Sequence, residues 1–336
     1  MTLLLLDLNK IFFTLCSNNY LPFAISLGSS LKEFDPETKL VIGLVDQLNP
    51  QFDYSAWKEF ELLPCFDLGY SEFESMLSRY NIIEFNTAVK PFYFEYLFAK
   101  YSEVDQIYYL DPDLYFYQSP QVLDGEWGEA EILLTPNLIY TTPKASTGEL
   151  ASLRHGMFNL GFLGLKRGVE SFRLIQWWKE RLKEHCRIDK CYGIFVDQKW
   201  IDLAPLFFDK IKLVKHPGWN MAWWNFSERK LLQTPEGYAV NQVDTPLVFF
   251  HFSGFKPEKN RLTERVLTEE FQEAENSALA DLYERYRKQI LNNGYEVLSK
   301  INPSLSFKEA PNSAWNQLGR KLKSKITNAI YRVFGV

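Results

Sequence analysis

The chain has 336 residues, of which 46% are hydrophobic, 16% aromatic and 24% charged. This length allows one large α/β domain with an appendage or two ordinary domains, and the composition excludes a chain that is disordered throughout. A formal net charge of −5 provides no overall positive field for polyanions, and no motif for reading DNA or RNA occurs. No nucleic-acid partner is therefore predicted.

Cysteine usage and the N-terminus bear on the cellular compartment. The four cysteines, at 16, 65, 186 and 191, are few for this length, and the last two lack the spacing of a zinc site. The leucines at 3–6 have no basic flank and are too few for a secretory signal, and no apolar run is long enough to span a bilayer. These features predict a cytoplasmic protein with reduced thiols.

The N-terminal part of the chain predicts a β-α-β unit. KIFFTLCS, at 10–17, is typical of a buried strand, and Pro22 suits the first turn of the helix that follows. A second apolar run, 39–46, completes the unit. A further helix is predicted over 88–101, and it leads into the strand QIYYL at 106–110.

The alternation of strands and helices continues to about residue 260. Apolar runs predict strands at 131–136 and 158–165, and an amphipathic pattern predicts a helix over 168–187. Residues 1–260 are therefore interpreted as one α/β domain.

The composition changes after this domain. Residues 261–301 are predicted to form a helical extension, with a charged helical pattern over 262–291, and the Pro- and Ser-containing stretch 302–314 is interpreted as a linker. The tail, 315–336, places five cations beside an apolar helical face. It is either a solvated terminal helix or a peripheral contact with an anionic membrane on its cytoplasmic side.

Asp111 and Asp113 directly follow the predicted strand at 106–110. In parallel α/β sheets ligands bind at the carboxyl ends of strands, and two neighbouring carboxylates repel each other unless a cation lies between them. The pair is therefore a candidate site for Mg or Mn. The alternative is a solvated turn, since Asp-Pro-Asp also favours turns.

A second candidate ligand is His251, at the end of the apolar run in PLVFFHFSGFKP, 246–257. Gly254 allows close backbone approach, and Lys256 is a point charge suited to a diphosphate. Imidazole suits Mn better than Mg. A histidine at a strand end is also often a purely structural residue.

Five segments, in chain order, resemble motifs of the glycosyltransferase family that contains glycogenin and the bacterial lipopolysaccharide galactosyl- and glucosyltransferases. They are FFTLCSNNYLPFAISLGSSLKE at 12–33, YLDPDLYF at 109–116, FNLGFLGL at 158–165, FVDQKWID at 195–202 and HFSGFKP at 251–257. Each motif is weak or moderately specific alone, whereas the ordered set is a strong signal over roughly residues 10–257.

This resemblance implies a GT-A fold, which is an α/β fold with a mixed, mainly parallel sheet flanked by helices. It implies sugar transfer from a nucleotide-diphosphate donor, expected to be a UDP-sugar, with a divalent Mn or Mg ion and retention of anomeric configuration. The implied acceptor is a glycan or a lipid-linked saccharide. By position, the implied metal ligands are Asp111, Asp113 and His251, and the implied catalytic residues are Asp197 and Gln198.

The predicted donor-binding residues come from several segments. Tyr20 would stack on the base, Asn159 and Gly161 would line the sugar pocket, and Lys256 would hold the diphosphate. The complete set is Cys16, Tyr20, Lys90, Asn159, Gly161, Gly254 and Lys256.

The last motif departs from the family pattern. Its lysine, Lys256, lies one residue closer to the glycine, and Glu258 stands where the family has Trp. Lys90 is a candidate substitute contact for phosphate, although a lysine at a helix start is commonly just solvated.

The segment 216–229, HPGWNMAWWNFSER, does not match glycogenin. Its tryptophans with Asn220, Asn225 and Arg229 could form a sugar platform, or the tryptophans could be core under a long loop. Two other functions stay open. One is a nucleotidyltransferase of similar fold, although CSNNYLPF stands where such enzymes carry a Gly-rich basic loop, and the other is a non-catalytic glycan-binding protein.

Overall fold

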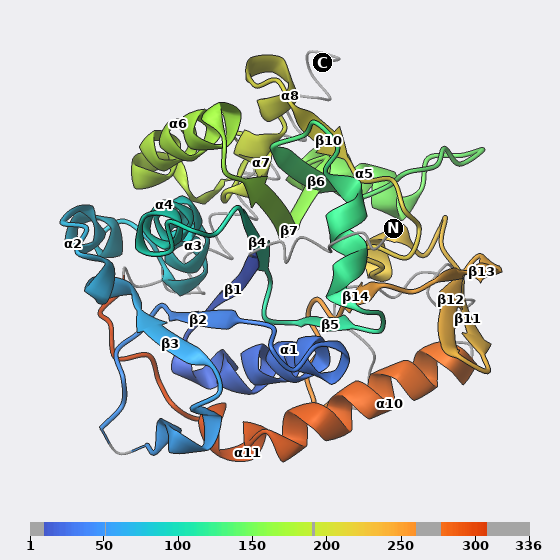
Figure 1. The fold of residues 1–336 in the computed structure, drawn as a ribbon, viewed down its shortest axis with the longest axis horizontal. Helices are drawn as coiled ribbons and strands as arrows, with labels where there is room; N and C mark the ends of the chain where they lie inside the picture. Colours follow the sequence, from blue (N-terminus) through green and yellow to red (C-terminus); the bar gives the residue numbers. More distant parts are fainter. Residues whose placement is uncertain (1–9, 51, 190–191, 260–276, 308–336) are drawn as a thin grey trace, which may run out of the picture.

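The computed structural model describes residues 10–50, 52–189, 192–259 and 277–307. Its centre is a seven-stranded sheet in which every neighbouring pair is parallel except the two that involve β7 (Figure 1). In spatial order the strands are β10 (Ile211–Leu213), β6 (Ile132–Pro136), β7 (Phe158–Lys166), β4 (Gln106–Leu110), β1 (Lys10–Cys16), β2 (Leu40–Leu44) and β3 (Glu61–Pro64). The structure therefore confirms the predicted mixed, mainly parallel sheet.

Helices cover both faces of this sheet. The α-helices of the described residues are α1 (Leu21–Phe34), α2 (Glu72–Leu77), α3 (Ile82–Ala88), α4 (Lys90–Lys100), α5 (Thr147–His155), α6 (Val169–His185), α7 (Gln198–Ile201), α8 (Ala204–Phe207), α10 (Ser277–Asn292) and α11 (Tyr295–Leu298). The predicted strands and helices before residue 190 are all present within a few residues of their expected bounds.

Strand β1 shows why the layers form. Its side chains alternate between the two faces, so Phe12 joins the core beneath α1 whereas Phe13 joins the core beneath α4. The strand is buried on both faces, as expected for a parallel strand between helices. Cys16, Cys65 and Cys186 are free and buried in these cores.

Within the described part of the chain, three smaller sheets accompany the central one. A short antiparallel pair joins β5 (Leu114–Phe116) to β14 (Phe249–His251). The others are formed by β11 (Leu231–Thr234), β12 (Gly237–Val240) and β13 (Gln242–Pro246), and by β8 (Ile188–Asp189) and β9 (Ile194–Phe195). The β5–β14 pair matters most for the site, because β5 follows Asp113 and β14 ends at His251.

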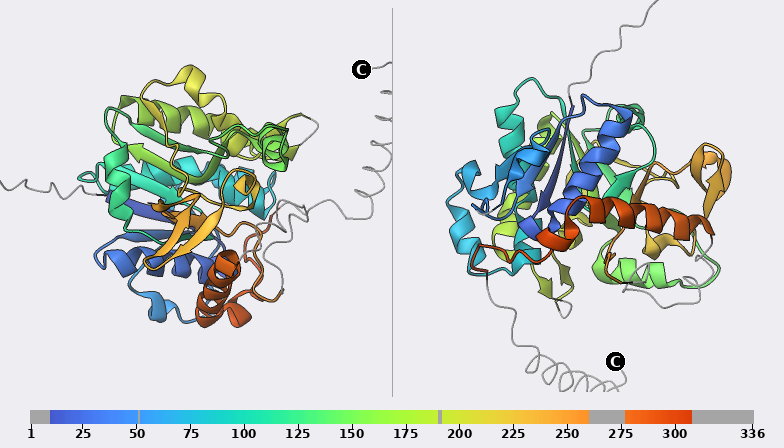
Figure 2. Two further views of the ribbon diagram at one scale, coloured as in Figure 1. Left: turned by 90° about the vertical axis from the view of Figure 1, so that its right-hand side faces the viewer. Right: turned by 90° about the horizontal axis from the view of Figure 1, so that it is seen from below.

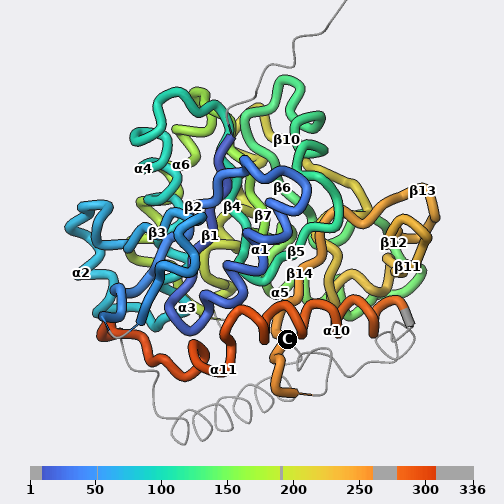
Figure 3. Tube along the Cα trace, turned by 60° about the horizontal axis from the view of Figure 1, so that its bottom comes forward, coloured from blue at the N-terminus to red at the C-terminus, as the bar shows by residue number. Residues whose placement is uncertain are grey.

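The C-terminal helix α10 runs from the small β11–β13 sheet to the side of α1, as two views show (Figures 1 and 2). Its apolar face shares a core with the segment that carries His251, and Phe252 stacks on Tyr286 with ring centroids 3.6 Å apart. The chain then continues through α11 along the same side of the molecule (Figure 3). The helical extension thus buttresses β14.

The predicted linker is described only over 302–307, and there it packs on the domain. Both the amide and the hydroxyl of Ser304 donate hydrogen bonds to the buried carboxylate of Asp46, at 2.8 and 2.5 Å, and Leu305 is buried. The tail 315–336 and residues 261–276 of the predicted extension lie outside the described residues. None of the described helices is long and apolar enough to cross a membrane.

Candidate active site

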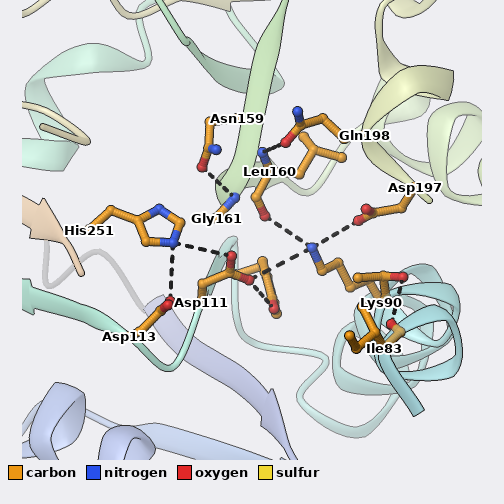
Figure 4. A network of polar contacts seen from close by, with 12 residues as sticks. Ile83, Lys90, Asp111, Asp113, Asn159, Leu160, Gly161, Asp197, Gln198 and His251 are labelled. Atoms are coloured by element: carbon orange, nitrogen blue, oxygen red, sulfur yellow. Dashed lines mark hydrogen bonds and ion pairs between the residues drawn. The ribbon is translucent and has the colours of Figure 1, made fainter. Parts of the chain in front are cut away.

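Asp111, Asp113 and His251 converge at the carboxyl end of β4 (Figure 4). Pairing of β14 with β5 sets His251 opposite Leu114, and therefore next to Asp113. The imidazole Nε2 lies 3.1 Å from Oδ1 of Asp113 and 3.7 Å from Oδ2 of Asp111. One ligand atom from each of the three side chains lies within 4.8 Å of the others. The short antiparallel pairing of β5 with β14 thus brings together residues that are far apart in the sequence.

The chemistry of this cluster fits a divalent cation. Two carboxylates and one imidazole form an O,O,N donor set that suits Mn²⁺ and, with less preference, Mg²⁺. His251 is buried, whereas Asp111 and Asp113 keep 28% and 15% of their side-chain surface exposed, so a ligand can reach the acids from solvent. The residues present therefore fit the predicted metal.

Asp111 is held in place by its neighbours. The Tyr109 hydroxyl donates to Oδ1 of Asp111 at 2.5 Å, and the Asp111 amide donates to the carbonyl of Gly161 at 2.7 Å. Tyr109 lies two residues earlier on β4 and so on the same face of the strand, which brings its hydroxyl within reach. Sequence reasoning overlooked this contact, although the two-residue spacing was a usable signal.

Lys90 connects the candidate metal cluster, which is formed by Asp111, Asp113 and His251, to the Asp-Gln motif. It begins α4 and is 3% exposed, and its Nζ lies 2.8 Å from Oδ2 of Asp197 and 3.8 Å from Oδ1 of Asp111. It also donates to the carbonyl of Leu160 at 3.1 Å. Burial alone would lower the pKa of Lys90, but the charges of Asp197 and Asp111 outweigh it and raise that pKa. The ammonium therefore stays charged and engaged with protein groups.

Asp197 and Gln198 lie against β7. Asp197 immediately precedes α7 and is 2% exposed, and burial raises its pKa against the opposing effect of Lys90. Gln198 accepts from the Leu160 amide at 3.4 Å and donates to the carbonyl of His155 at 3.1 Å. The Asp-Gln motif is thus brought beside the predicted sugar-pocket segment (Figure 4).

Gly161 and Asn159 occupy the part of β7 nearest His251. A Cβ at position 161 would lie 2.6 Å from Cε1 of His251, so a larger residue there would displace the imidazole. The Gly161 amide donates to Oδ1 of Asn159 at 3.0 Å. Both predicted pocket residues are therefore packed around the metal cluster.

Asn220 belongs to this group although sequence reasoning placed it only in the ambiguous Trp-rich segment. Its side chain reaches His251, Asn159 and Thr135 by hydrogen bonds of 3.0 to 3.1 Å. Nothing in the spacing of the chain indicated these partners.

The remaining predicted donor-binding residues are Cys16, Tyr20, Gly254 and Lys256. Cys16 is buried in the core beneath α1, so its thiol is directed into the protein. Tyr20 is 38% exposed and stacks on Phe23. Gly254 has φ +77°, the left-handed conformation that glycine allows at no steric cost, and Lys256 is exposed. Their roles toward a donor stay predictions.

The Trp-rich segment is largely core. Trp219 is buried beneath the central sheet, and Trp224 is buried with its ring edge-on to His251 at 5.1 Å. Glu228 and Arg229 form a buried ion pair, and Glu228 also accepts from the amides of Ile139 and Tyr140. The segment therefore packs against His251 through Trp224. Of its three tryptophans, only Trp223 is partly exposed.

No family model matches the chain. Two Bacillus subtilis (strain 168) proteins described as uncharacterized are 25% identical to it. YfnF matches over 246 residues, which is 72% of this chain and 80% of YfnF, and YfnD matches over 252 residues, which is 73% and 77%.

Among solved structures, the galactosyltransferase LgtC in complex with donor and acceptor sugar analogues superposes with a TM-score of 0.50. The match is 15% identical and covers 84% of this chain and 95% of LgtC. At this identity the likeness concerns the fold, and it agrees with the seven-stranded, mainly parallel sheet flanked by helices. The chain has the GT-A glycosyltransferase fold.

Proposed function

We propose that this protein is a metal-dependent glycosyltransferase that moves a sugar from a nucleotide-diphosphate donor to a glycan or lipid-linked acceptor. The observation that carries the proposal is the convergence of Asp111, Asp113 and His251 on one point, beside the buried Lys90–Asp197 ion pair. All of these residues except Lys90 come from three of the five segments that resemble motifs of such enzymes.

The proposed donor is a UDP-sugar. Asp111, Asp113 and His251 would hold the metal, which when bound supplies positive charge that stabilises the departing diphosphate. Tyr20, exposed at the start of α1 and already stacked on Phe23, would take the base on its ring. Lys256 is exposed in the segment after β14 and would meet the diphosphate from that side.

The sugar would lie between β7 and α7. Asn159 and Gly161 belong to β7, and Asp197 and Gln198 lie at the start of α7, where Gln198 accepts a hydrogen bond from the Leu160 amide. Carboxylate and amide groups beneath the ring would stabilise the positive charge that develops at the anomeric carbon. Burial raises the pKa of Asp197, and the neighbouring Lys90 ammonium opposes that rise. We propose that the acceptor attacks the face that the diphosphate leaves, with retention.

The acceptor proposal draws on the tail as well as on the fold. LgtC was solved with an acceptor sugar analogue, and residues 315–336 of this chain combine five cations with an apolar face. We propose cytoplasmic action on a saccharide, with the tail able to hold the enzyme at an anionic leaflet. Removal of 315–336 should release the protein from anionic liposomes, and unchanged binding would refute the membrane contact.

The experiment that tests the function is a thermal-shift screen of nucleotide sugars, each with and without Mn²⁺, followed by product analysis for the best donor. A ligand that binds only the folded protein raises its apparent stability, so the proposal predicts a rise that requires both nucleotide and metal. Free sugars serve as the control. Stabilisation by free saccharides without nucleotide would instead favour a glycan-binding protein, and release of pyrophosphate from a nucleoside triphosphate would favour a nucleotidyltransferase.

A further inference from the structure

Asn220 is the centre of a buried hydrogen-bond network behind the metal cluster. It is 1% exposed. Its Nδ2 donates to Oδ1 of Asn159 at 3.0 Å and to Oγ1 of Thr135 at 3.1 Å, and its Oδ1 lies 3.1 Å from Nδ1 of His251. One amide thus joins β6, β7 and β14.

The polarity of this network determines which ring nitrogen of His251 carries hydrogen. Because the NH₂ group of Asn220 already donates to two oxygens, its Oδ1 faces the imidazole, and Oδ1 can only accept. Nδ1 of His251 must therefore carry the hydrogen and donate it. The other ring nitrogen, Nε2, faces Asp113 at 3.1 Å and is the atom left to bind a metal.

The orientation of the Asn159 side-chain amide also follows from its partners, because the backbone amide of Gly161 can only donate. Its Oδ1 accepts from the Gly161 amide and from Asn220, both at 3.0 Å. The NH₂ group of Asn159 consequently lies on the other side and is available as a donor. It is suited to an oxygen acceptor such as a sugar hydroxyl or a phosphate oxygen.

Both the backbone and the side chain at position 220 require asparagine. The residue has φ +52°, in the left-handed region where glycine and asparagine are favoured. Glycine would satisfy the backbone but has no amide, and aspartate could accept from His251 but could not donate to Asn159.

We propose that Asn220 is a positioning residue that directs Nε2 of His251 toward the metal and the amide NH₂ of Asn159 toward the donor sugar. One side chain then couples the metal ligand to the sugar pocket. The identities of metal and sugar rest on the proposed function, whereas the hydrogen-bond polarity does not.

The first test uses nuclear magnetic resonance of the metal-free protein labelled with ¹⁵N-histidine at pH 8. Only four histidines are present, so His251 can be assigned with a His251→Gln variant. We expect Nδ1 of His251 to carry a hydrogen that exchanges slowly with solvent, and we expect Asn220→Gly to abolish that protection. An Nδ1 without hydrogen in the wild type would overturn the proposal, whether or not the protein binds metal.

The second test separates the two roles by binding measurements. Asn220→Gly should weaken Mn²⁺ binding by about 10- to 100-fold, as for lost partners of other metal-binding histidines. Asn220→Asp keeps the acceptor for Nδ1, so Mn²⁺ and UDP binding should change only a few-fold, while affinity for the UDP-sugar falls about tenfold relative to UDP.

Asn241→Gly is the matched control, because Asn241 also has a left-handed backbone, with φ +64°, but lies on the surface away from His251. It should leave Mn²⁺ binding unchanged. Wild-type Mn²⁺ affinity in Asn220→Gly, or equal losses of UDP and UDP-sugar affinity in Asn220→Asp, would refute the coupling. Absence of Mn²⁺ binding in the wild type would refute both the proposed function and the coupling. The direction of the hydrogen bond between His251 and Asn220 is decided separately by the ¹⁵N-histidine experiment.

Discussion

Nζ of Lys90 lies 2.8 Å from Oδ2 of Asp197, and the two side chains are 3% and 2% exposed. This ion pair ties the start of α4 to the start of α7. The same ammonium lies 3.8 Å from Asp111, so it also compensates charge at the metal cluster. The pair is therefore both a structural contact and a part of the proposed site.

Replacing Lys90 with Met should be strongly destabilising. The change leaves Asp197 buried without its cation, and breaking a buried pair in this way costs about 3 to 5 kcal/mol of unfolding free energy. The double variant Lys90→Met with Asp197→Asn removes both charges and should recover most of that loss. Urea denaturation of the two single variants and the double variant measures the coupling. Strictly additive losses would show that the two side chains do not interact in solution.

Replacing Asp113 with Asn should abolish Mn²⁺-dependent binding of UDP and sugar transfer while the protein remains folded. The change removes one carboxylate ligand but keeps the size of the side chain. Calorimetric titration with Mn²⁺ and UDP, together with circular dichroism, checks both parts. Asp105→Asn is the matched control. Asp105 directly precedes β4, and its carboxylate faces Lys166.

Metal removal gives an independent test of the same site. Treatment with EDTA should stop transfer, and added Mn²⁺ should restore it. Transfer that continues at full rate in excess EDTA would argue strongly against the mechanism.

Tyr286 on α10 should matter for stability through its ring and not through its hydroxyl. The ring stacks on Phe252 and is buried, so Tyr286→Ala should cost about 3 kcal/mol or more. Among the described residues the Tyr286 hydroxyl has no hydrogen-bond partner, so Tyr286→Phe should be neutral or raise the unfolding free energy by up to about 1 kcal/mol. Thermal unfolding of both variants decides this, and a large loss in Tyr286→Phe would contradict the packing described.

Glu131 should give stability that disappears in acid. Burial alone would raise the pKa of Glu131, but hydrogen bonds from Lys210 and from the amides of Glu170 and Ser171 outweigh it and hold that pKa below its usual value. A carboxyl whose pKa is lower in the folded state stabilises the protein above its unfolded pKa of about 4.3, and this contribution is lost as the pH falls through the folded pKa.

The comparison with Glu131→Gln isolates this contribution. At pH 7 the variant should be about 1 kcal/mol less stable, because a charged partner at the start of α6 is lost. The difference from wild type should shrink as the pH falls below about 4.3, as measured by urea denaturation at each pH. A difference that stays constant from pH 7 to pH 3.5 would refute the assignment.

The sequence predicted those features that depend on local pattern. Buried strands ending in acids, such as β4 before Asp111, show their period and their terminus within a few residues. The ordered motifs also predict that His251 shares a site with the two acids. The helix-start lysine Lys90 was interpreted only as a phosphate contact or a solvated residue, because nothing in the spacing shows that Asp197 approaches it.

Asn220 shows most clearly what sequence pattern cannot supply. Its partners Thr135 and Asn159 lie 85 and 61 residues earlier in the chain, and the contacts arise only when β6, β7 and β14 are assembled. From the sequence, the neighbouring tryptophans are compatible either with a sugar platform or with a place in the core. Burial of Trp219 and Trp224 depends on the loop and strand that cover them, which no local period encodes.

The central claim, that His251 and the two acids share one divalent ion, is tested most directly by pulsed electron paramagnetic resonance of Mn²⁺ bound to the ¹⁵N-histidine protein. The account predicts a coupling between the Mn²⁺ electron spin and one histidine nitrogen, lost in His251→Gln, and loss of the tightly bound Mn²⁺ signal in Asp113→Asn. Tightly bound Mn²⁺ without nitrogen coupling, or with a signal that Asp113→Asn leaves unchanged, would contradict it.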